Sequence, residues 1–331
     1  MASLPTQVAA HSSRLHLVAS PTQKKKPRLS PLALWHLLSL DAPSVAALWV
    51  IFAGRSAGIR LPAFDPLAMF IAVWMLYAAD RLLDARPLTA GVLSADLEER
   101  HRFHHRHRAV FVPCIALAAL PLACLLHELA TPVLHLYALL ASLLAGWLLL
   151  VHAQPAPSAG ARRLPKEFAV GLFFPAAVFI PTVARAPALR LALLPGAFLF
   201  AGVCTLNCLF LYAWEHPRDR SRAHASTGRA LQQLVPLATI LLIGSTSFCL
   251  LAATGRWFRG TGDSSGISRS FIASLPHPAM LPAACALSIA LLLALHAMRQ
   301  RFSPLRLRAL ADVALLTPLL FLVPMLFQRP R

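Results

Sequence analysis

The sequence predicts an all-α, polytopic integral membrane protein: a bundle of nine transmembrane helices with the N-terminus in the cytoplasm and the C-terminus outside. Three observations predict this class: 57% of the 331 residues are hydrophobic, 13% are charged, and the formal net charge is +18. Disordered chains have low hydrophobicity, and soluble domains are about one quarter charged. Nucleic-acid-binding domains can be this basic but are less apolar. The composition therefore excludes these classes and argues against nucleic acid as a partner.

Apolar residues gather in nine windows, each close to the roughly 20 residues that a spanning helix needs. The windows cover 33–54, 62–83, 109–127, 131–152, 167–185, 191–213, 230–253, 277–298 and 307–327. Lipid does not tolerate unpaired backbone, and the alternation of a membrane barrel is missing from the sequence, so the windows are predicted to be helices. Prolines in many windows predict kinks: Pro43, Pro113, Pro121, Pro175, Pro181, Pro195, Pro236 and Pro318.

The orientation follows from the basic residues. With the N-terminus in the cytoplasm, 22 of the 31 Lys and Arg residues fall on the cytoplasmic side and 9 on the other, in agreement with the positive-inside rule. Residues 1–30 are predicted to be a disordered basic cytoplasmic tail, with a transit peptide as the alternative. Residues 31–331 are predicted to form a single domain. The expected membrane is the bacterial inner membrane, and an organelle inner membrane is the alternative.

Paired acidic residues end two of the predicted helices. Asp80 and Asp84 end the second window and, at spacing i, i+4, lie on one helix face. A bound cation would relieve their repulsion, and Mg²⁺ is commonly held by carboxylates together with substrate phosphates. The alternative is an ordinary helix end in which Asp84 pairs with Arg81 or Arg86. Glu215 and Asp219 repeat the spacing after the sixth window, where ion pairs with neighbouring arginines are the alternative.

Other polar residues on the cytoplasmic side suggest further contacts. The segment with His101, His104, His105 and His107 is predicted to be a basic amphipathic helix on the membrane surface, and a zinc site is the weaker alternative because arginines are interleaved. Arg102 in this segment and Lys166 are candidate phosphate contacts. Asp41 and Asp312 are isolated intramembrane acids that should face the bundle, each other or an arginine.

With these motifs, the chain resembles the UbiA superfamily of intramembrane prenyltransferases. Asp80 and Asp84 match the last two acids of an NDxxDxxxD-type motif, and Glu215 and Asp219 stand near the carboxylates of a second, DxxxD-type motif. Leu76 and Tyr77 replace the Asn and first Asp of the first motif. His216 and Arg220 stand where Asp is common in the second.

The resemblance implies a function. Two Mg²⁺ ions, held by Asp80, Asp84, Glu215 and Asp219, would bind the diphosphate of a prenyl donor, and the isoprenoid chain would pass to a hydrophobic or aromatic acceptor on the cytoplasmic side, within membrane lipid. The implied substrate-binding residues are Tyr77, Arg81, Arg102, Lys166, Asn207, Tyr212, Arg218 and Arg220. The replaced motif residues leave an alternative open: a membrane protein that binds or transports a lipid or small molecule without chemistry.

Overall fold

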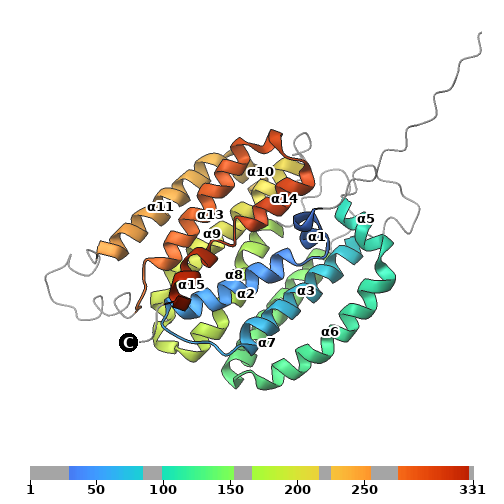
Figure 1. Ribbon diagram of the computed structural model, residues 1–331, viewed down its shortest axis with the longest axis horizontal. Helices are drawn as coiled ribbons and strands as arrows, with labels where there is room; N and C mark the ends of the chain where they lie inside the picture. The colour runs from blue at the N-terminus through green and yellow to red at the C-terminus, as the bar shows by residue number, and fades with distance from the viewer. Residues whose placement is uncertain (1–29, 85–98, 153–165, 216–224, 255–274, 328–331) are drawn as a thin grey trace, which may run out of the picture.

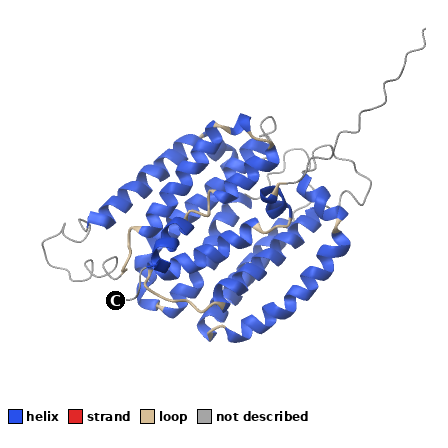
Figure 2. Ribbon diagram, viewed as in Figure 1, coloured by secondary structure: helices blue, strands red, loops and turns tan. Residues whose placement is uncertain are grey.

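A computed structural model describes residues 30–84, 99–152, 166–215, 225–254 and 275–327. Over these residues the chain is helical, with no strand (Figure 2). The α-helices are α1 (Pro31–Leu37), α2 (Asp41–Ser56), α3 (Phe64–Asp84), α5 (Glu99–Arg106), α6 (Arg108–Glu128), α7 (Thr131–His152), α8 (Lys166–Arg185), α9 (Arg190–Glu215), α10 (Ala225–Gln232), α11 (Leu234–Thr254), α13 (Met280–Ala297), α14 (Pro304–Val313) and α15 (Pro318–Phe327). Two 3₁₀ turns, Pro187–Leu189 and Arg299–Arg301, complete the described structure.

The long helices form one bundle, and the short helices α1, α5, α10 and α14 gather toward one end of it (Figure 1). We call this the short-helix end; α3 and α9 both finish there. The closest packing joins α8 to α9, α2 to α3, and α11 to α13. At the centre Trp49 of α2 is fully buried and stacks on Phe200 of α9 at 3.8 Å between ring centroids. The core therefore links the N-terminal helices to the middle of the chain.

Several helices are long and apolar enough to cross a membrane, and this makes the chain an integral membrane protein. Among the described residues six helices qualify singly, and up to eight spans result if each of two bent helix pairs is one span. In α6 only 6% of the most apolar window is buried, and leucines such as Leu117 and Leu120 are about two-thirds exposed. An apolar surface of this extent is unfavourable in water and favourable against lipid.

The first predicted window, 33–54, is not one continuous helix. It is divided into α1 and α2, whose axes differ by 89°. Between them Ser39 takes a positive φ of 60°, in the left-handed region that few non-glycine residues adopt. The window averages hydropathy, and because the residues at the break are mostly leucine, hydropathy does not detect the break.

The last predicted window, 307–327, is also bent, by 41° between α14 and α15. Pro318 begins α15, where its missing N–H costs nothing. Elsewhere helices continue through their prolines, as α8 does at Pro175 and Pro181. The helical class is thus confirmed, and in the described residues the large bends lie at breaks between helices and not at prolines inside them.

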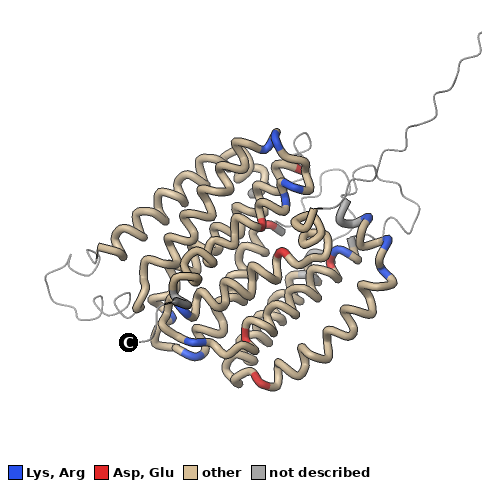
Figure 3. The backbone as a smooth tube through the Cα atoms, viewed as in Figure 1, with Lys and Arg blue, Asp and Glu red and all other residues tan. Residues whose placement is uncertain are grey.

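Charged residues sit mainly toward the ends of the helices (Figure 3). At the end of the bundle opposite the short helices, Asp65 at the start of α3 is buried and pairs with Arg185 at the end of α8, with 2.8 Å between Nη1 and Oδ2. This pair ties α3 to α8. The other buried charges lie at the short-helix end.

Candidate functional site

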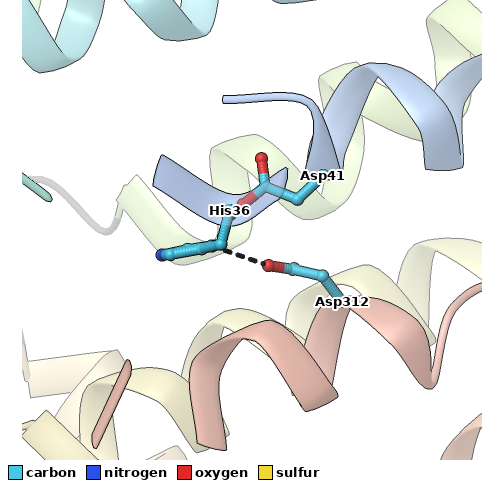
Figure 4. Close-up of side chains that lie close together, drawn as sticks. All are labelled: His36, Asp41 and Asp312. Carbon is cyan, nitrogen blue, oxygen red and sulfur yellow. Dashed lines mark ion pairs between the residues drawn. The ribbon is translucent and has the colours of Figure 1, made fainter. Parts of the chain in front are cut away.

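A buried polar network surrounds the bend between α1 and α2. His36 of α1 places Nδ1 2.5 Å from Oδ2 of Asp41, the first residue of α2, and 3.6 Å from Oδ2 of Asp312 in α14. The side chains of His36 and Asp41 are 1% and 3% exposed, and that of Asp312 is 15% exposed. Two carboxylates and an imidazole thus meet inside the bundle, contributed by three helices (Figure 4).

Arg81 of α3 completes this network. Its Nη1 donates to the carbonyl of His36 at 2.7 Å and to Oγ of Ser39 at 2.8 Å, and its Nη2 donates to Oδ2 of Asp41 at 3.3 Å. Oγ of Ser39 also lies 3.0 Å from Nε2 of His104 in α5. The guanidinium therefore holds the strained Ser39 in place and compensates the charge of Asp41. We name His36, Ser39, Asp41, Arg81 and Asp312 the bend network.

The bend network has the composition of a possible metal site. His36, Asp41 and Asp312 each offer one ligand atom, and these atoms lie within 4.8 Å of one another. Within the described ranges this is the one such group of three or more His, Cys, Asp or Glu side chains. Arg81 already compensates one carboxylate, so a divalent ion would leave excess positive charge in a buried place, which is costly. The charge balance favours a network of ion pairs and hydrogen bonds.

The two ring nitrogens of His36 have different surroundings. Both are buried and lack a hydrogen bond of normal geometry among the described residues, and Nδ1 lies at ion-pair distance from the carboxylates of Asp41 and Asp312. In Figure 4 the His36 ring extends away from both carboxylates. The imidazole therefore presents one nitrogen to the acids and the other to a different part of the interior.

The structure places the predicted residues of α3 on different faces of its last turns. Asp80 is exposed, and Asp84 is the last residue of the helix. Arg81 is buried in the bend network, so a contact to a phosphate would require its present bonds to be exchanged. Tyr77 is partly buried and packs against the hydrophobic core. The interior face of α3 thus leads to the bend network and toward α9.

The predicted residues of α9 that the structure describes also lie at the short-helix end. Asn207 is buried, and its Oδ1 has no hydrogen-bond partner among the described residues. Tyr212 is partly buried against the main core. Glu215 ends the helix and forms an ion pair with Arg308 of α14. The alternative partner expected from the sequence, Arg218 in the loop that follows, lies outside the described residues.

A pocket of about 220 Å³ opens beside Glu215, lined by Trp214, Glu215, Arg299, Phe302 and Arg308 among others. Trp214 Nε1 donates to Nδ1 of His296 in α13 at 3.0 Å. The pocket combines two guanidinium groups, a carboxylate and aromatic rings, a composition suited to an anionic group with an apolar or aromatic part.

The remaining predicted residues take no part in the bend network or the pocket beside Glu215, or they lie outside the described residues. Arg102 is exposed on α5, and Lys166 is the first residue of α8. Arg218, Asp219 and Arg220 lie outside the described residues. The chemistry of Asp80, Asp84 and Glu215 fits Mg²⁺, which prefers carboxylate oxygens. For Glu215, such an ion would compete with Arg308.

The helix predicted around the four histidines is confirmed as α5, which is amphipathic. His104 is buried, and Arg102 and Arg106 are exposed. No metal-binding group forms on this helix among the described residues.

The expectation that Asp41 and Asp312 face each other or an arginine is confirmed. His36, Ser39 and Arg308 were not among the site residues expected from the sequence. Arg308 could have been identified from the sequence, because it lies four residues before Asp312 and so on the same helix face. No family model, curated protein or solved structure matched the chain in comparisons with known proteins.

Proposed function

We propose that the chain is a UbiA-type intramembrane prenyltransferase that moves an isoprenoid chain from a prenyl diphosphate to a hydrophobic or aromatic acceptor. The reaction would take place at the short-helix end of the bundle. The observation that carries the proposal is that α3 and α9 both finish at this end of the bundle (Figure 1), with Asp80 in the last turn of α3 and Glu215 as the last residue of α9.

The chain supplies the kinds of groups that this chemistry needs. The diphosphate must be held by positive charge as the allylic C–O bond breaks and its electron pair moves to the leaving oxygen. Arg308 and Arg299 beside the pocket offer that charge, and Lys166 is a further candidate. Asp80, Asp84, Glu215 and Asp219 would hold Mg²⁺, which when bound would neutralise the diphosphate.

The aromatic groups have a matching role. Tyr77, Tyr212 and Trp214 pack against the core close to these acids, and their π faces would stabilise positive charge on the allyl group. Asn207, with a buried carbonyl oxygen that lacks a hydrogen-bond partner among the described residues, is suited to accept a hydrogen bond from an acceptor hydroxyl. The apolar interior between the helices would take the isoprenoid tail.

The proposal includes a topology of nine spans. It counts the six single helices, the two bent pairs, and α7, whose Thr131–Trp147 part is apolar but shorter. The N-terminus and the short-helix end would face the cytoplasm of a bacterium whose inner membrane holds the protein. Reporter fusions after residues 30, 190 and 225 test this: cytoplasmic, external and cytoplasmic signals are expected, and a cytoplasmic signal at 190 would contradict it.

The activity is tested in membranes that contain the full chain, with a radiolabelled prenyl diphosphate and aromatic acceptors. The variants Asp80→Ala, Asp84→Ala and Glu215→Gln should each lower transfer by about 100-fold, the scale of a lost charge-stabilising group in an active site. Glu128→Gln, an exposed acid at the other end of α6, is the matched control and should leave transfer unchanged. Transfer that survives in both aspartate variants would refute the proposed site.

A second function is favoured by the bend network, because intramembrane carboxylates with a histidine also suit carriage of an ion or of a small molecule. It predicts binding of a lipid or small molecule that needs no Mg²⁺ and no turnover of any prenyl diphosphate. Transfer that depends on Mg²⁺ would exclude it.

A further inference from the structure

An open apolar groove of about 320 Å³ lies between the α1–α2 bend, α3 and the corner where α5 meets α6. Leu40, Trp74, Phe103, Val110, Phe111 and Cys114 line it, and His107 is its most polar wall. An engineered apolar cavity of roughly 150 Å³ stays dry and binds benzene. A groove of about twice that volume with these walls therefore favours hydrocarbon over water.

The walls of the groove are held by contacts between the residues that line it. The Phe103 ring lies 4.3 Å from the His107 ring and 6.2 Å from the Phe111 ring, measured between centroids. Trp74 donates from Nε1 to the carbonyl of Leu38 at 3.1 Å, so the bend holds the indole in place. A preformed groove costs a ligand little ordering of the protein.

Two arginines stand beside the groove where α5 ends and α6 begins. Arg106 ends α5 and Arg108 begins α6, both are exposed, and both flank the groove residue His107. The apolar span of α6 starts at Arg108. Cys114 is six residues further along, which is about 9 Å at 1.5 Å per residue. The arginines therefore stand at the depth of lipid headgroups, and the groove continues from them into the depth of acyl chains.

We propose that this groove binds one acyl chain of an anionic phospholipid, with the lipid phosphate held by Arg106 and Arg108. Charge complementarity selects the occupant: a basic border and a hydrocarbon groove match a lipid with a net negative headgroup. Each basic residue near a membrane surface is worth about 1 kcal/mol toward anionic lipid, which is about fivefold in affinity. The site does not depend on the proposed transferase activity, and it lies apart from the pocket beside Glu215.

The test measures lipid retained by the full chain. Purified protein is incubated with equal amounts of phosphatidylglycerol and phosphatidylethanolamine that carry the same acyl chains, then washed, and bound lipid is quantified by mass spectrometry. Wild-type protein should prefer phosphatidylglycerol by about 25-fold, the product of two fivefold contributions. Arg106→Gln/Arg108→Gln should abolish the preference. Arg301→Gln/Arg306→Gln, which changes two exposed arginines that line neither pocket, should keep it.

A second pair of variants tests the groove itself. Val110 and Val112 are each 58% exposed on α6, but only Val110 is among the groove residues. Val110→Phe should lower the retention of both lipids at least fivefold, and Val112→Phe should not. Equal behaviour of the two arginine pairs, or of the two valine variants, would overturn the proposal. Retention of a prenyl diphosphate in place of phosphatidylglycerol would overturn the assignment of the groove to a phospholipid.

Discussion

Removal of the Arg81 guanidinium tests whether the bend network is a balanced set of buried charges. In Arg81→Met, Asp41 and Asp312 keep two carboxylates inside the bundle, and His36 can supply at most one compensating charge. Breaking a buried ion pair from one side costs about 3–5 kcal/mol. At roughly 2 °C per kcal/mol for a large domain, the midpoint of thermal unfolding should fall by about 6–10 °C.

The assay is the thermal change of tryptophan fluorescence in detergent, which Trp49 reports because it is fully buried against Phe200. Arg306→Met is the matched control: Arg306 is exposed on α14, and its loss should cost less than about 0.5 kcal/mol. The control shows whether loss of any cationic side chain in this region lowers the midpoint.

The decisive variant is the double change Asp41→Asn/Arg81→Met. It leaves Asp312 facing His36, a pair that can balance itself, so most of the stability should return, with a coupling of about 2 kcal/mol between the two sites. If the double variant loses as much unfolding free energy as the two single variants together, the charge balance of the bend network is contradicted, because the cost would then come from lost packing instead of unbalanced charge.

Three further predictions concern helix contacts, each checked by the same unfolding measurement. Gly171→Ala should destabilise the α8–α9 packing by at least about 1 kcal/mol, because the added methyl group would overlap the Thr205 hydroxyl. Gly244→Ala is the control: it has no neighbouring heavy atom within 4 Å and should be neutral or stabilising. Equal effects of the two variants would contradict this prediction. Thr317→Val should cost about 0.6–1.7 kcal/mol, the range for hydrogen bonds between membrane helices, because Thr317 Oγ1 lies 2.8 Å from Ser288 Oγ; no change would mean that this bond contributes nothing. Arg308→Met should cost about 1 kcal/mol or less, since its ion pair with Glu215 is partly exposed, and a cost above 3 kcal/mol would show that Arg308 also compensates Asp312.

The helical class was predictable because lipid restricts a spanning backbone to few structures. Each of the nine apolar windows contains at least one described helix. The break between α1 and α2 was not predictable, since the residues that hold it, Arg81 and His104, lie 42 and 65 positions after Ser39. Local spacing carries no information on such contacts.

The same limit applies to the candidate site. That Asp41 and Asp312 face the interior of the bundle and find partners there could be expected, because a lone charge inside a membrane needs a partner. For Arg81, the expectations were an ion pair with Asp84 or, from the family resemblance, a contact to the substrate, but the folded-back α1 gives it carbonyl and carboxylate partners in the interior. Glu215 likewise pairs with Arg308, 93 positions later in the chain, a contact that local spacing does not predict.

The residues of the bend network are synthesised at different times in each newly made chain. Ribosomes add about 5–20 residues per second. Arg81, 40 positions after Asp41, follows it within about 2–8 seconds. Asp312 comes 271 positions after Asp41, so its synthesis takes about 14–54 seconds longer than that of Asp41. When Arg81 has been made, both partners of Asp41 in the bend network, His36 and Arg81, are already present in the chain, and Asp312 is added to the network only after most of the bundle has been synthesised.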